Sequence, residues 1–171
     1  QFPGSDVSFV NASKDGKKVV VLVDSDRDPG SFYLYDADTK KVGFLLARAP
    51  WIKPETLAGM EPFEIKARDG LSLHGFLTRP AGQEAAKKLP MVVFVHGGPF
   101  EVQDKWAYDR EVQMLASRGY AVLQVNFRGS GGYGGAFVDA GWGEWGAKMQ
   151  DDVTDATRWA IEQGAADPKR I

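Results

Sequence analysis

Short runs of apolar residues, broken by turn sequences, fill the first fifty positions of the chain. β-rich runs occupy residues 17–25, 31–38 and 41–47, and the turn sequences KDGK, RDPG and DADTKK separate or flank them. This spacing predicts an antiparallel meander. The strands are about enough for one propeller blade or for the edge of a sandwich, and alone they are too few for a stable domain.

The next stretch combines a proline-rich segment with a hairpin signal. Residues 49–62 contain three prolines and no clear periodicity, and we interpret residues 51–62 as a linker. After it, two alternating runs flank Asp69-Gly70, a strong short-range signal for a β-hairpin. We therefore expect paired strands at about 63–67 and 71–79.

From residue 91 the pattern changes to continuous apolar strands that alternate with helical periodicity. MVVFV and YAVLQV are typical of strands buried on both faces, and each helical stripe ends at a glycine. DPKRI at the end resembles the start of another strand. Alternation of this kind predicts the α/β class, with parallel strands and right-handed crossovers. The predicted strands are 91–95 and 120–125, and the predicted helices are 109–119 and 148–164.

Composition and charge exclude several classes of protein. The formal net charge is −2 at pH 7, which gives no sign of binding to nucleic acid or to an anionic membrane surface. No apolar run approaches the roughly 18 residues of a membrane span. The absence of cysteine excludes disulfides, thiolate zinc sites and a cysteine nucleophile within these residues. The two histidines, His74 and His96, are too far apart in sequence to suggest a metal site.

The sequence HGGP, residues 96–99, follows the predicted strand 91–95 directly. Open α/β sheets place their sites at the carboxyl ends of strands, and glycines there let backbone N–H groups face a ligand. His96, Gly97 and Gly98 are therefore candidate site residues, with a backbone N–H as donor to an oxyanion. The alternative is a plain tight turn in which His96 is packed or solvated.

A glycine-rich block follows the second buried strand. FRGSGGYGGAF contains a formal G-x-G-x-x-G, which would suit a dinucleotide only if a helix opened immediately. Because more glycines follow and the next helix is expected near residue 148, we favour a long ordered loop beside the site. Arg128 would anchor this loop, and Tyr133 is a second candidate neighbour of the site.

Three other features invite a catalytic interpretation. His96 precedes Ser130, as in a chymotrypsin-like order, but a helix and a parallel strand between them do not fit a two-barrel protease. Asp151 and Asp155 share a helix face, which we interpret as a solvated face near a helix N-terminus. His74, in an alternating strand, is expected to be structural.

Four segments taken together resemble the prolyl oligopeptidase family of serine peptidases, in particular its acylaminoacyl-peptidase and dipeptidyl-peptidase-like bacterial branch. These are EPFEIKARDGLSLHGFLTRP, MVVFVHGGPF, LASRGYAVLQVNFRGSGGYGGAF and GWGEWGAKMQDDVTDATRWAIEQGAADPKRI. The resemblance implies a partial α/β-hydrolase fold preceded by antiparallel strands of a β-propeller. The implied domains are the last propeller blade at 1–50, the linker at 51–62, and the first part of the hydrolase domain at 63–171.

The resemblance also implies an activity. The family cleaves short peptides with a Ser-Asp-His triad, whose serine sits in a G-x-S-x-G elbow. No such elbow occurs in these residues, so the triad would lie downstream and the chain alone is expected to be inactive. Gly98 resembles the residue whose N–H completes the oxyanion hole. His96 precedes every place the serine could occupy, which argues against a role as the triad histidine.

The implied partners are a peptide substrate and the remainder of the catalytic domain, either as a second chain or as a C-terminal continuation. No cofactor, metal, nucleic acid or membrane partner is implied, a homo-oligomer is compatible with the sequence, and the compartment is left open between cytoplasm, periplasm and secretion. Two other functions stay open: an esterase or lipase of the same fold, and a non-catalytic α/β binding module.

Overall fold

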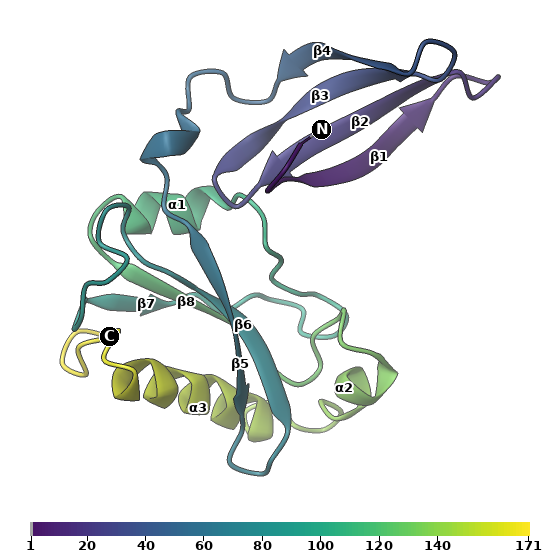
Figure 1. The fold of residues 1–171 in the computed structure, drawn as a ribbon. Coiled ribbons are helices and arrows are strands. Elements are labelled where there is room, and N and C mark those ends of the chain that lie inside the picture. The colour runs from purple at the N-terminus through teal and green to yellow at the C-terminus, as the bar shows by residue number, and fades with distance from the viewer. Residues whose placement is uncertain (1) are drawn as a thin grey trace. The chain divides into compact units, whose positions relative to one another are not determined.

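The computed structural model describes residues 2–171, which divide into two compact units (Figure 1). The first comprises the residues up to Leu57 together with Ala107–Asp109, and the second comprises Ala58–Trp106 and Arg110–Ile171. Each unit has its own sheet, so each is described by itself.

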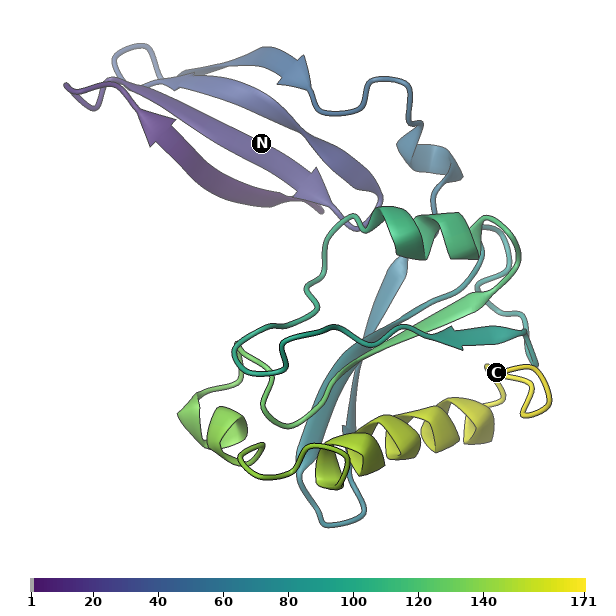
Figure 2. The same cartoon turned by 180° about the vertical axis from the view of Figure 1, so that it is seen from behind.

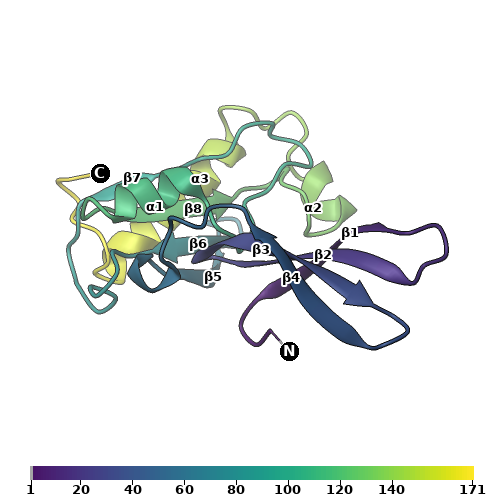
Figure 3. The same cartoon turned by 90° about the horizontal axis from the view of Figure 1, so that it is seen from above.

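The first unit is a four-stranded antiparallel meander in the order β1-β2-β3-β4 (Figure 3). The meander prediction is confirmed, and β1 is a strand that the sequence pattern did not suggest. Few of its side chains are buried: Phe9 and Phe44 are 70% and 62% exposed, whereas Val23 is buried. Its strands are β1 (Asp6–Ala12), β2 (Lys18–Ser25), β3 (Asp28–Asp36) and β4 (Lys41–Ala47), and a 3-10 turn follows at Pro54–Thr56.

The second unit contains a mixed sheet in the order β5-β6-β8-β7. β5 (Met60–Lys66) and β6 (Ser72–Thr78) form the predicted hairpin, and Gly70 turns it with a φ of +90°. β6 pairs antiparallel with β8 (Ala121–Asn126), and β8 pairs parallel with β7 (Met91–Val93). Among the named strands of residues 2–171, the expected parallel pairing joins β7 and β8.

Helices cover both faces of this sheet. α1 (Arg110–Ala116) connects β7 to β8 on one face, and α3 (Lys148–Glu162) lies on the opposite face (Figures 1 and 2). Phe63 on β5 stacks on Trp159 of α3 with ring centroids 4.5 Å apart. The core between sheet and α3 contains Leu77, Met91, Leu123, Val125, Ala156 and Ala160. Burial of these apolar side chains is the main force that joins α3 to the sheet.

The C-terminal segment lies alongside the beginning of β7. Leu89 N–H donates to Ala165 O at 3.0 Å, and Asp167 N–H donates to Leu89 O at 2.9 Å. Further along, Met91 N–H donates to Arg170 O at 2.9 Å. This parallel arrangement agrees with the expectation that DPKRI begins another strand of the same sheet.

Several predicted element boundaries differ from the structure. β5 begins at Met60, inside the segment 51–62 that was interpreted as a linker. Strand 91–95 is regular only to Val93, and helix 109–119 is shorter, at Arg110–Ala116. A five-residue helix, α2 (Gly135–Asp139), opens within the glycine-rich block, directly after Gly134, where no helix was expected before residue 148. The start of α3 at Lys148 is as predicted.

Candidate functional site

The HGGP loop leaves β7 and is held by the loop that follows β8. His96 Nε2 lies 2.9 Å from Ser130 Oγ, and His96 Nδ1 lies 2.8 Å from Gly97 O. The imidazole stacks on Phe127, with centroids 4.6 Å apart and planes at 16°. His96 is therefore held by two hydrogen bonds and a ring stack, and none of these contacts is to a carboxylate.

Gly97 and Gly98 differ in their surroundings. Gly98 has a φ of +118°, and a Cβ there would lie 2.8 Å from Val102 Cγ2. Around Gly97 a Cβ would meet no atom within 4 Å. Across residues 2–171, no acceptor is recorded for the Gly98 N–H. That N–H is therefore available to an oxygen from outside the described residues.

A hollow of about 250 Å³ lies beside this loop. One part of its lining is the HGGP loop. Another part comes from Trp145, which precedes α3, and from Met149 and Val153 in the first turns of α3. Its other lining residues are Val95, Phe127, Gly146 and Gln150. The hollow is small and mostly apolar, which suits part of a ligand in contact with a few polar groups.

The glycine-rich block packs against the HGGP loop and its continuation. Glu101 N–H donates to Gly129 O at 3.1 Å, and Gly131 N–H donates to Val102 O at 3.0 Å. A Cβ on Gly131 would lie 2.5 Å from Glu101 O, so only glycine permits this approach. Although α2 opens after Gly134, Gly129 and Gly131 are hydrogen-bonded to the backbone of Glu101 and Val102 rather than facing an open phosphate site. This supports the ordered-loop interpretation over a dinucleotide site.

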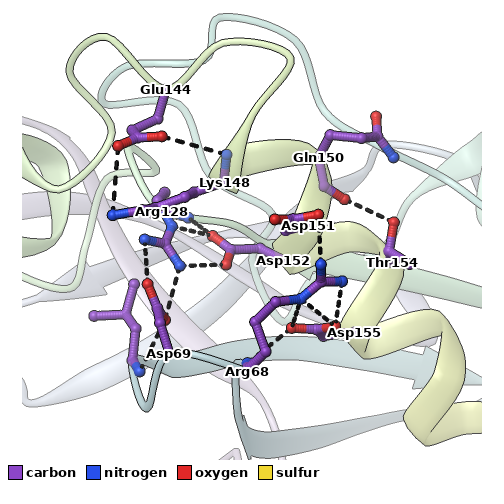
Figure 4. A network of polar contacts seen from close by, with 11 residues as sticks. Arg68, Asp69, Arg128, Glu144, Lys148, Gln150, Asp151, Asp152, Thr154 and Asp155 are labelled. Carbon is purple, nitrogen blue, oxygen red and sulfur yellow. Dashed lines mark hydrogen bonds and ion pairs between the residues drawn. The ribbon is translucent and has the colours of Figure 1, made fainter.

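Arg128 lies at the centre of a buried ion-pair network (Figure 4). Its guanidinium donates to both oxygens of Asp152 at 2.7 and 2.8 Å and to both oxygens of Asp69 at 2.9 and 3.1 Å. Asp152 Oδ2 also accepts from the Arg128 backbone N–H at 2.9 Å. The hydrogen bond from Arg128 lowers the pKa of Asp69 to about 2. The two carboxylates raise the pKa of Arg128 despite its burial.

Asp155 is not on a solvated face as expected, because its side chain is only 12% exposed, whereas Asp151 is 43% exposed. Arg68, next to the hairpin turn, pairs with Asp151 at 2.8 Å and with both oxygens of Asp155 (Figure 4). Its backbone N–H also donates to Asp155 Oδ2 at 2.8 Å. The interpretation was wrong for Asp155, because Arg68 is 87 residues away in sequence and only the fold brings it to α3.

Tyr133 anchors the glycine-rich loop to β8 and β6 and does not line the hollow. Its hydroxyl accepts from Asn126 Nδ2 at 2.9 Å, and its ring stacks on His74 with centroids 4.4 Å apart and planes at 4°. Burial raises the pKa of the Tyr133 hydroxyl. Asn126, fully buried, also holds Asp104 through the backbone N–H and C=O, at 2.8 and 3.0 Å.

The structure thus separates the candidate site residues into two groups. His96, Gly97 and Gly98 line the hollow. Arg128 and Tyr133 are not among its lining residues, and their hydrogen bonds anchor the neighbouring loop. Sequence reasoning missed Ser130 as a partner of His96, and it missed Asp152. A signal for Asp152 was present, because it occupies a position of the buried helical stripe between Met149 and Ala156.

Over residues 2–171, no group of three or more His, Cys, Asp or Glu side chains could hold a metal ion. The helices described there also include none that is long and apolar enough to cross a membrane.

Comparison with known proteins shows which family this sequence and fold resemble. Residues 106–171 match the model of the prolyl oligopeptidase family. This segment belongs to the prolyl oligopeptidase family. Relatives similar to nearly the whole chain include dipeptidyl aminopeptidase BIII from Pseudoxanthomonas mexicana, at 38% identity over 99% of the chain. The uncharacterized peptidase YuxL from Bacillus subtilis is 32% identical over 96% of the chain. The chain spans 25% of the length of each of these two relatives.

Solved structures of prolyl oligopeptidase relatives share the fold. A puromycin-hydrolyzing peptidase from Mycobacterium tuberculosis superposes with a TM-score of 0.80 at 29% identity, over 91% of this chain and 24% of that one. Acylaminoacyl peptidase from Pyrococcus horikoshii gives a TM-score of 0.74 at 26% identity, over 94% of this chain and 25% of that one. The family resemblance expected from the sequence is thereby confirmed.

Proposed function

We propose that this chain is part of a serine exo- or oligopeptidase that hydrolyses short peptides. A Ser-Asp-His triad outside residues 1–171 would perform the chemistry, and the HGGP loop would contribute one half of the oxyanion hole. The observation that carries this proposal is the Gly98 N–H, which lies at the end of β7, beside the hollow, with no acceptor within residues 2–171. Removal of one such donor costs about 100- to 1,000-fold in rate, so its placement matters.

The mechanism needs a donor aimed at the charge that develops on the scissile carbonyl oxygen. Attack by a serine hydroxyl on that carbonyl forms a C–O bond, and the carbonyl π electrons move onto the oxygen. Gly98 N–H would stabilise this oxyanion, and a second N–H would come from the residue after the serine. Collapse of the tetrahedral intermediate then expels the leaving amine, which takes the proton that the triad histidine removed from the serine.

We assign the two units to the two domains of such a peptidase. Residues 1–50 would be the last blade of a β-propeller, residues 51–62 the linker, and residues 63–171 the first part of the α/β-hydrolase domain. Support comes from the sheet order β5-β6-β8-β7 and from the C-terminal segment that lies along β7. The remainder of the catalytic domain would extend the sheet beyond that segment, and the 171 residues alone would be inactive.

The decisive experiment uses the full-length protein. We expect it to react with a fluorophosphonate probe and to cleave aminoacyl-anilides faster than short acyl esters of similar size. Higher activity on the esters would favour an esterase or lipase of the same fold. Absence of labelling would favour a non-catalytic binding module and would contradict the peptidase proposal. The chain of residues 1–171, expressed alone, is the matched control and should not be labelled.

A further inference from the structure

The two hydrogen-bond partners of His96 indicate which tautomer its neutral imidazole adopts. His96 Nδ1 lies 2.8 Å from Gly97 O, and a carbonyl oxygen can only accept, so Nδ1 carries a proton. In the neutral ring Nε2 is then bare, and it accepts the hydrogen bond from the Ser130 hydroxyl, 2.9 Å away. Ser130 is fully buried, so water does not compete for this hydroxyl.

The carbonyl that His96 holds belongs to the same peptide group as the proposed oxyanion donor. Gly97 C=O and Gly98 N–H are two ends of one planar unit, which is trans in this structure. In a trans peptide these two bonds point in opposite directions, so fixing the carbonyl also fixes the N–H. The hydrogen bond from His96 Nδ1 therefore sets the direction in which Gly98 N–H points.

This peptide group has little else to hold it. It lies between two glycines, which rotate more freely than other residues. No atom lies within 4 Å of the place where a Gly97 Cβ would be, so packing does not restrain that side. Val102 crowds only the Gly98 side, so the imidazole contact is the restraint on the carbonyl side of this peptide. A donor that must be aimed at an oxyanion loses effect when its orientation is not fixed in advance.

Ser130 is itself held in a firm frame. Its N–H donates to Phe127 O at 3.0 Å, and the neighbouring Arg128 is fixed by Asp152 and Asp69. Gly131 N–H bonds to Val102 O, which ties the serine loop to the chain just after HGGP. The hydroxyl is thus presented to the imidazole from an ordered loop and not from a mobile one.

We propose that Ser130 is a positioning residue of the oxyanion hole, which acts through His96. It holds His96 in the Nδ1–H tautomer, His96 holds the Gly97 carbonyl, and the shared peptide plane aims Gly98 N–H. Ser130 touches neither substrate nor reacting atoms. This inference rests on the proposed peptidase function, because only an enzyme with an oxyanion makes use of that N–H.

The test compares Ser130→Ala, His96→Phe and the double variant in the full-length protein. His96→Phe keeps an aromatic ring to stack on Phe127 and removes both hydrogen bonds. Each single variant should lower kcat and the rate of fluorophosphonate labelling about tenfold, with KM changed less than about threefold, because a misdirected donor retains part of the 100- to 1,000-fold effect of an intact one. The double variant should be no worse than His96→Phe alone, because Ser130 acts only through His96.

Ser117→Ala is the matched control, since it removes a serine hydroxyl that bonds to Met114 O at the end of α1, in the same unit. It should leave kcat and KM unchanged. If Ser130→Ala behaves like Ser117→Ala, or if the two losses multiply in the double variant, the positioning role is wrong while the peptidase function stands. If the wild-type protein is neither labelled nor active on peptides, the peptidase function itself fails.

Discussion

Arg128 and Asp152 form a bidentate buried ion pair. Arg128 Nη2 lies 2.7 Å from Asp152 Oδ1, and Arg128 Nε lies 2.8 Å from Asp152 Oδ2. The side chain of Arg128 is 4% exposed and that of Asp152 is not exposed at all. This pair joins the loop after β8 to the first turns of α3. It therefore holds in place the loop that carries Phe127 and Ser130, the two contacts of His96.

Asp152→Asn should destabilise the protein strongly. The amide retains the shape but not the charge, so Arg128 is left buried with only the partly exposed Asp69 as a counter-ion. Breaking a buried pair from one side costs about 3 kcal/mol or more. Urea unfolding followed by tryptophan fluorescence measures this loss. Asp151→Asn is the control, because its pair with Arg68 is about half exposed and should be worth less than about 1 kcal/mol. Equal losses would contradict the network as described.

Asp69 should make stability depend on pH in the acid range. Its pKa in the folded protein is about 2, against an ordinary value of 3.8, because Arg128 donates to its ionised form. The lowered pKa means that the stabilisation is complete above about pH 4 and is lost as the pH falls towards 2. Because Asp69 is partly exposed, solvent screening reduces the effect to roughly 1 kcal/mol.

The measurement for Asp69 is a series of urea unfolding curves between pH 4.5 and 2. The wild type should lose more stability over this range than Asp69→Asn, while other acidic groups, such as Asp36 beside Lys18, contribute equally to both proteins. Parallel loss in the two proteins would show that the Asp69–Arg128 contact carries no pH dependence.

Local patterns predicted most elements of the second unit, although not α2, because the causes of those elements are local. Asp69-Gly70 specifies a tight turn, and the continuous apolar runs specify strands with both faces covered. The start of α3 at Lys148 follows from the stripe of apolar side chains in the sequence after it. The HGGP loop was likewise located, since it had only to follow a recognisable strand.

Pairings across long sequence distances could not be predicted in the same way. Ser130 and His96 are 34 residues apart in sequence, and Arg68 and Asp155 are 87 residues apart. Neither contact can therefore be recognised from a short stretch of sequence. The antiparallel pairing of β6 with β8 has the same character, because order in a sheet depends on global topology. A charged residue on a buried stripe, as at Asp152, is the one such contact that did leave a local signal.

Asn126→Ala should cost more stability than Tyr133→Phe. Asn126 is fully buried and makes three hydrogen bonds, two to the backbone of Asp104 and one to the Tyr133 hydroxyl. Removal of its amide breaks all three of these part-buried hydrogen bonds, at a cost of about 2 to 3 kcal/mol. Tyr133→Phe removes a single hydrogen bond and keeps the stack on His74, at a cost of about 1 kcal/mol. Thermal unfolding of both variants checks the order, and a larger loss for Tyr133→Phe would show that the loop is anchored by the tyrosine.

His96→Ala in the full-length enzyme should reduce kcat only moderately. Loss of an entire oxyanion donor reduces kcat by about 100- to 1,000-fold, and the effect of His96→Ala should be smaller than that. The variant removes the contact to Gly97 O but leaves the Gly98 N–H in the chain. Single-turnover kinetics on an aminoacyl-anilide measures the effect on chemistry alone. A loss comparable to that of replacing the triad serine would mean that His96 itself takes part in the reaction.

Gly98→Ala and Gly97→Ala should separate two neighbouring glycines by function. Gly98 has a φ of +118°, and a Cβ there would lie 2.8 Å from Val102 Cγ2, so alanine is both strained and crowded. The expected loss of stability is about 1 to 3 kcal/mol. The shift of the backbone should also displace the proposed donor and lower kcat by about 100-fold. At Gly97 the φ is outside the positive region and the space is open, so alanine should change stability by less than about 1 kcal/mol and kcat by less than about tenfold. If Gly98→Ala retains full activity and Gly97→Ala does not, the donor belongs to a different peptide group from the one proposed.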